Sequence, residues 1–278
     1  MITLNNNTYK LCLFDTNALS EFLKNQKLWI SYFDNEFSLG NTIICYSIFS
    51  LSELWFRQDL FDKYLEFFSV FPSAILDGYD SIFQKEQKSY YKNDIVNPIV
   101  VVPSSIGGKL TSSKTQLMEV IEKSEFFNKT EHWKSSQLDI LNGILSLIKN
   151  FPPRKNKYSV SEIEEFNFIV STQQLGLRNM EFAKSVLRTK KHIELDKFPS
   201  IKSTSYFVFY KFYLDNRKPL LSDIFDIIIS SLLPYVDYVI TEGNMCEIIR
   251  TIRNRHNFLN TLNEISIKES NKKIKHYT

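Results

Sequence analysis

The stretch Tyr9–Asn17 constrains the fold of this chain more than any other. Within it, Leu11–Phe14 is a short unbroken apolar run, typical of a strand buried on both faces of a parallel sheet. The run ends at Asp15, and an amphipathic helix pattern follows over Ala18–Lys24. Because open α/β sheets bind ligands at the carboxyl ends of their strands, Asp15 is a candidate metal ligand. The alternative is that Asp15 or Asn17 only caps the next helix.

Further strand patterns occur near both ends of the chain. Thr42–Tyr46 is apolar and β-branched, Ser73–Leu76 is a short strand candidate, and Val236–Thr241 is a strand followed at once by Glu242. We expect these strands to share one parallel sheet, with the strand over Leu11–Phe14 in its centre and beside the one that ends at Thr241.

The middle of the chain, Tyr79–Asn216, is dominated by helical patterns. We therefore expect an α/β domain made of residues 1–78 and 217–260, a helical insertion over 79–216, and a basic C-terminal tail over 261–278. The expected helices are Leu28–Phe37, Leu51–Asp59, Phe61–Phe71, Tyr79–Tyr91, Lys114–Lys123, His132–Asn150, Ser161–Gln174, Asn179–Lys190, Thr204–Asn216, Asp223–Leu233 and Met245–Arg255, with Ser104–Lys109 and Lys197–Lys202 as loops.

The composition excludes several classes of protein. The net charge of +3, from 34 basic and 31 acidic residues, is too balanced to indicate nucleic-acid binding by itself. The chain has only 7 glycines and no G-x-G-x-x-G motif, which argues against a phosphate-binding loop. Cys12, Cys45 and Cys246 form no C-x-x-C pair and are expected to be free thiols. With no signal-peptide pattern and no apolar run near the ~20 residues of a membrane span, we expect a cytoplasmic protein without membrane contact.

Four acids lie in settings too apolar for ordinary surface charges. Asp15 and Glu242 each follow a predicted strand, Glu53 lies among the apolar residues of a predicted helix, and Asp226 interrupts the run IFDIIIS. An isolated buried carboxylate is costly, so it is normally paired or bound to a metal. Carboxylates that converge at one sheet edge repel each other, and Mg²⁺ or Mn²⁺ would relieve that repulsion.

In their order along the chain, the motifs LFDTN, SLSEL, SDIFDIIISSLLPYVDY and VITEGN resemble the PIN-domain nucleases. The resemblance implies a three-layer, parallel-sheet PIN-like domain of the α/β class, here with a long α-helical insertion. It also implies that Asp15, Glu53 and Asp226 are the core acids and that Asn17 is the polar residue after the first. Glu242 stands where the family usually has a fourth Asp, so a one-metal and a two-metal site both remain open.

The same resemblance implies a Mg²⁺- or Mn²⁺-dependent phosphodiesterase that cleaves RNA, such as a toxin or defence effector. Its metal ligands would be Asp15, Asp226 and Glu242, with Asp223 as a further candidate, and Asn17 and Thr241 would contact substrate. An antitoxin or other protein partner and a homo-oligomer are compatible with it. A nuclease directed at DNA would share these acids.

Each acid also has a structural interpretation. Glu53 could pair with Arg57 four residues later, Glu242 could cap the helix that follows it, and Asp223 could be an acid favoured by a helix N-terminus. The alternative function is a catalytically inactive PIN-like scaffold that binds RNA or protein through its insertion. Basic residues at Lys184–Lys191 and aromatic residues at Tyr206–Tyr213 suit single-stranded RNA, although such runs more often form solvated faces and core.

Overall fold

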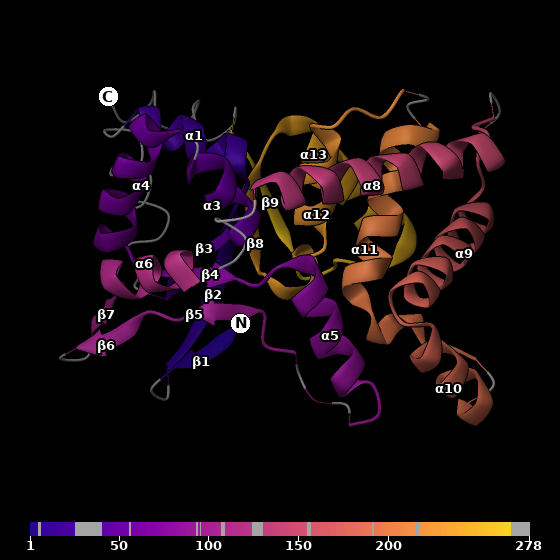
Figure 1. The fold of residues 1–278 in the computed structure, drawn as a ribbon, viewed down its shortest axis with the longest axis horizontal. Helices are drawn as coiled ribbons and strands as arrows, with labels where there is room; N and C mark the ends of the chain where they lie inside the picture. Colours follow the sequence, from indigo (N-terminus) through magenta and orange to yellow (C-terminus); the bar gives the residue numbers. More distant parts are fainter. Residues whose placement is uncertain are drawn as a thin grey trace.

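In the computed structural model, a mostly parallel sheet forms the centre of the molecule (Figure 1). The structure describes residues 1–4, 7–25, 41–55, 57–92, 94, 96–106, 109–123, 130–154, 157–190, 192–214 and 217–267. The helix expected over Leu28–Phe37 lies outside these residues. The strands of the sheet are β1 (Ile2–Leu4), β2 (Asn7–Phe14), β3 (Thr42–Ser47), β4 (Ser73–Leu76), β5 (Ile99–Val101), β8 (Tyr238–Thr241) and β9 (Asn263–Ser266).

Strand β2 is central. The strand order is β5-β4-β3-β2-β8-β9, and β1 is an additional antiparallel partner of β2. Strands β2, β3, β4, β8 and β9 run parallel, whereas β5 pairs antiparallel with β4. The register places Phe14 opposite both Tyr46 and Ile240, so β2 and β8 end together. The predicted position of the first strand, central and beside the strand that ends at Thr241, is confirmed.

Helices cover both faces of this sheet (Figure 1). The helices are α1 (Thr16–Lys24), α3 (Ile48–Trp55), α4 (Gln58–Val70), α5 (Tyr79–Ser89), α6 (Lys114–Lys123), α8 (Thr130–Asn150), α9 (Val160–Arg178), α10 (Met180–Lys190), α11 (Pro199–Val208), α12 (Asp223–Ser230) and α13 (Gly243–His256), with a π-helical segment η2 (Phe209–Leu214) and short 3₁₀ turns η1 (Leu195–Lys197) and η3 (Leu233–Tyr235). The architecture is therefore α/β, as predicted.

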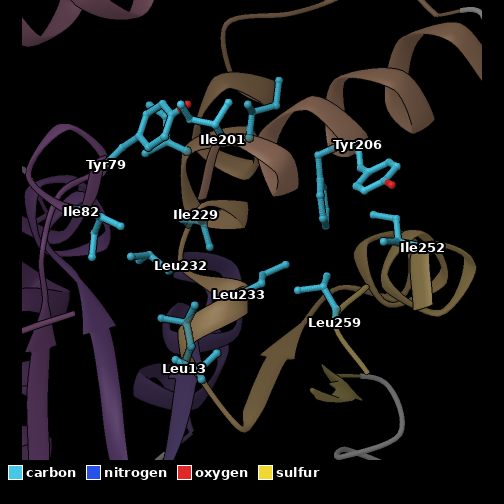
Figure 2. Close-up of a cluster of buried hydrophobic side chains, with 14 of the residues drawn as sticks. Leu13, Tyr79, Ile82, Ile201, Tyr206, Ile229, Leu232, Leu233, Ile252 and Leu259 are labelled. Carbon is cyan, nitrogen blue, oxygen red and sulfur yellow. The ribbon is translucent and has the colours of Figure 1, made fainter. Parts of the chain in front are cut away.

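Alternation along β2 explains the two covered faces. Side chains of a strand point to opposite sides of the sheet, so Leu11 and Leu13 belong to one buried cluster and Cys12 and Phe14 to the other. The Phe14 cluster is completed by α1, α3, α4 and α6. Figure 2 shows the other cluster, in which Leu13 shares a core with side chains of α11, α12 and α13. All four of these β2 side chains are buried, as their unbroken apolar run predicts.

The segment between Tyr79 and Asn216 is mostly helical but is not separate from the sheet. Strand β5 adds an edge to β4, and α11 packs against α12 within the shared core. One further link is polar: His256, the last residue of α13, lies between Tyr210 and Glu164 with a distance of 2.6 Å to each. The insertion and the two terminal segments therefore share one cluster of buried hydrophobic side chains.

Several boundaries differ from those expected. The helix expected over Leu51–Asp59 ends at Trp55, and α4 begins at Gln58. The loop expected over 104–109 contains two short strands, β6 (Ser104–Ile106) and β7 (Lys109–Thr111). Helix α11 begins inside the loop expected over 197–202, because Pro199 suits the first helical turn. Strand β9 extends the sheet into the range 261–278, which the sequence assigned to a basic tail.

Among the described residues, no helix has both the length and the apolar character needed to cross a membrane. Cys12, Cys45 and Cys246 are buried free thiols, as expected.

Candidate acidic site at the carboxyl edge of the sheet

Asp15 is buried where β2 ends, with only 3% of its surface exposed. It occupies the N-cap position of α1, yet its side chain makes no capping hydrogen bond. Instead, the Thr241 hydroxyl, at the end of the neighbouring strand β8, donates to Asp15 Oδ2 over 2.7 Å. This geometry favours a site role over the helix-cap interpretation. Thr241 is itself fully buried and so positions Asp15 rather than facing a substrate.

The electrostatics of Asp15 place two other acids near it. Burial, together with the negative charges of Asp226 and Glu242, raises the pKa of the Asp15 carboxyl to about 6. Hydrogen bonds from Thr241 and from the Thr16 backbone act in the opposite direction. Asp226 and Glu242 are more than 200 residues from Asp15 in sequence, and the fold brings their charges within electrostatic range of it.

Glu53 joins the same group from α3. Burial, together with the charges of Asp15 and Asp226, raises the pKa of its carboxyl to about 7, although a hydrogen bond accepted from Thr16 acts in the opposite direction. The Glu53 Oε2 atom is buried and has no hydrogen-bond partner among the residues that the structure describes. Arg57, the partner expected in the alternative interpretation, instead pairs with Asp59 at 3.2 Å. A buried carboxylate oxygen without a donor is costly and is a position where a ligand could bind.

Glu242 is held by another residue predicted for the site. Asn17, in the first turn of α1, donates from Nδ2 to Glu242 Oε1 over 2.7 Å. Glu242 occupies the N-cap position of α13 without a side-chain capping bond, so the capping interpretation has no support from its geometry. The Asn17 side chain therefore positions an acid, a role that the sequence did not suggest.

Asp223 and Asp226 lie one turn apart on α12, and both contact a lysine that sequence reasoning missed. Lys211 Nζ lies 3.3 Å from Asp223 Oδ1 and also contacts Asp226 Oδ2. Asp223 accepts two more hydrogen bonds, from Arg217 and from the Leu220 backbone N–H. The carboxylate of Asp223 is thus engaged by three donors, which agrees with a structural role at the helix start. A lone lysine inside the aromatic run FVFYKFY was the signal available for Lys211.

The acidic residues can be compared with the ligand set that a divalent cation requires. Among the described residues, no group of three or more Asp, Glu, His or Cys side chains is arranged so that it could hold a metal ion. However, the acids offer the oxygen donors that Mg²⁺ and Mn²⁺ prefer, and Glu53 Oε2 has no partner. The Lys211 ammonium also shows that this part of the site accepts a cation. The donor chemistry therefore fits Mg²⁺ or Mn²⁺, whereas the carboxylates are not assembled in advance.

A separate cavity lies away from the acidic residues. A groove of about 520 Å³ is bounded by α8, α9 and α11 and is lined mainly by apolar side chains. Ile227 and Ile228 of α12 line it, but Asp15, Glu53, Asp226 and Glu242 do not. The groove belongs to the helical insertion and not to the acidic site.

No protein-family model, curated protein or solved structure matches this chain.

The raised pKa of Asp15 predicts how pH affects stability in the absence of divalent cations. The pKa rises from 3.8 to about 6 on folding, so the folded protein holds the Asp15 proton more tightly than the unfolded chain does. The contribution of Asp15 to the free energy of unfolding is therefore fully present below pH ~4 and is lost as pH rises through about 6. Asp15→Asn removes this loss and should raise the free energy of unfolding at pH 8 by about 3 kcal/mol, with little effect at pH 4. Urea unfolding at both pH values measures this. The exposed control Asp62→Asn should show no such gain, and an equal gain in both variants would contradict the prediction.

Proposed function

We propose that this protein is a divalent-metal-dependent phosphodiesterase that cleaves RNA. The observation that carries the proposal is the acidic group around buried Asp15 at the end of β2, where Asp226 and Glu242 act on Asp15, and Asp15 and Asp226 act on Glu53. This edge is where open α/β sheets bind ligands. The order of the four acids along the chain, which resembles that of PIN-domain nucleases, supports the same assignment.

The four acids share one task in this proposal, and two neighbouring side chains support them. Asp15, Glu53, Asp226 and Glu242 would hold Mg²⁺ or Mn²⁺, which when bound lowers the pKa of a water ligand and offsets charge on a phosphate. Thr241 fixes the Asp15 carboxylate through its hydroxyl, and Asn17 fixes Glu242 through its amide. The raised pKa of Glu53 makes its carboxyl a group that can exchange a proton near pH 7.

RNA is the preferred substrate class because of the family resemblance, and a second surface is compatible with it. The exposed ring of Tyr91 lies 6.3 Å from that of Phe182, so the structure joins the aromatic pair Tyr90–Tyr91 to the basic helix α10. The Nζ atom of Lys190 lies 5.0 Å from the centroid of the Tyr90 ring, and the same ammonium group is paired with Glu194. Exposed rings beside basic side chains can stack bases of single strands.

The test is cleavage of end-labelled single-stranded RNA and DNA by purified protein with Mn²⁺, with Mg²⁺ or with EDTA. We expect RNA fragments with 5′-phosphate ends in Mn²⁺ or Mg²⁺ and intact RNA in EDTA. Cleavage of DNA but not RNA would support the phosphodiesterase activity but contradict RNA as the substrate. Intact RNA and DNA under all conditions would contradict the proposed activity.

The second candidate is a catalytically inactive scaffold. Two observations favour it: Lys211 already neutralises Asp226, and the apolar groove in the insertion offers a binding surface away from the acids. A scaffold would show no cation-dependent cleavage, and substitutions at the acids would leave its binding of RNA or protein unchanged. The cleavage assay therefore separates the two candidates.

A further inference from the structure

Lys211 is an unusual residue in this part of the molecule. It lies in the π-helical segment η2, and only 3% of its side chain is exposed. Its immediate neighbours along the chain, Tyr210 and Phe212, are buried aromatic residues. π-helical segments are rare and frequently occur at functional sites. The sequence therefore places one buried ammonium group, in a rare type of helix, beside the acids of α12.

The two acids that Lys211 contacts are held very differently. Asp223 is 5% exposed and has Arg217 and the Leu220 N–H as additional donors. Asp226 is 31% exposed and raises the pKa values of Asp15 and Glu53, so its charge faces the acidic site. Lys211 could thus give up its contact with Asp226 and still keep Asp223 as a buried counter-ion. Loss of both partners would leave an uncompensated buried charge, which is strongly unfavourable.

We propose that Lys211 is a resident counter-ion of the acidic site, which competes with a divalent cation for Asp226. Binding of the cation is then coupled to the transfer of Lys211 from a bridge between two acids to a single pair with Asp223. This inference rests on the proposed function, because it concerns the same acids. It adds that Lys211 lowers the affinity of these acids for a divalent cation.

The coupling has a measurable consequence. An ammonium group beside Asp226 both occupies a ligand oxygen and repels a second cation, so the wild-type protein should bind Mn²⁺ more weakly than a variant without Lys211. Coupling between two sites of this kind typically changes affinity 5- to 150-fold, and we expect about a tenfold effect. The protein would then respond only when divalent cations exceed a threshold set by Lys211.

The experiment measures the Mn²⁺ dissociation constant of the full-length protein by isothermal titration calorimetry. We expect Lys211→Met to bind Mn²⁺ about tenfold more tightly than wild type. Lys211→Arg, which keeps the charge, should stay within about twofold. The matched control Lys202→Met removes a lysine of α11 that pairs with Asp196, away from the acids, and should leave the affinity unchanged.

A second measurement uses the wild-type protein, so that the test does not depend on the folding of Lys211→Met. NMR of the Lys211 ammonium group should show a change in its chemical shift on titration with Mg²⁺, which is diamagnetic, while the Lys202 ammonium serves as the unchanged reference. Unchanged or weaker Mn²⁺ binding by Lys211→Met, or an unchanged chemical shift of Lys211 at saturating Mg²⁺, would overturn the competition while Mn²⁺ binding by wild type still supports the proposed function. If neither the wild type nor Lys211→Met binds Mn²⁺, both proposals fail.

Discussion

Replacement of Asp15 by Asn is expected to lower Mn²⁺-dependent RNA cleavage by on the order of 10³-fold without loss of the fold. Asp15 is the buried centre of the acidic group, and its charge influences Glu53 in addition to being influenced by Asp226 and Glu242. Asn has nearly the same shape and can still accept the hydrogen bond from Thr241, but it cannot supply the negative charge that a cation requires.

The measurement is the initial rate of cleavage of labelled RNA at saturating Mn²⁺, with circular dichroism to verify folding. Asp62→Asn, an exposed substitution on α4, is the matched control and should retain the wild-type rate. If Asp15→Asn cleaves as fast as wild type while the fold is intact, the acidic site is not the active site.

Phe14→Ala is expected to reduce the free energy of unfolding by about 3–5 kcal/mol. Phe14 is fully buried in the central strand, and its ring lies 5.3 Å from Phe22 and 6.3 Å from Phe67, between centroids. Removal of the ring leaves a cavity where α1 and α4 meet the sheet, and the tight packing of these elements limits how far they can collapse into it.

Urea unfolding monitored by circular dichroism checks this value. Phe168→Ala provides the comparison, since that ring is 52% exposed on α9 and its removal should change stability by less than about 0.5 kcal/mol. Similar losses for the two variants would mean that β2 is not the centre of the hydrophobic structure.

The sequence was sufficient to predict the two strands that end at Asp15 and Glu242. The apolar run Leu11–Phe14 predicted a central strand because a strand buried on both faces leaves no room for polar alternation. The same reasoning, that a charge in an apolar run must have a partner, selected Asp15 and Asp226. It would also have selected Lys211 if it had been applied to bases as well as acids.

Features that depend on partners far away in the sequence could not be predicted from local sequence patterns. Strand β9 has the sequence NEIS, which has little strand character by itself and pairs because β8 offers it an open edge. The link between Asn17 and Glu242 joins residues 225 positions apart, and no local pattern indicates it. The position of the Lys211 ammonium depends on the π-helical segment, and the sequence pattern did not indicate a π-helix there.

The place of β2 between β3 and β8 has a consequence for the synthesis of the protein on the ribosome. Asp15 emerges before the Thr241 hydroxyl that holds it, which comes 226 residues later. At translation rates of about 5–20 residues per second, the growing chain spends at least roughly ten seconds with one edge of β2 unpaired along Cys12–Phe14. A nascent or prematurely terminated chain therefore cannot assemble the acidic site, and any hydrolytic activity would begin only when the last strands have been made.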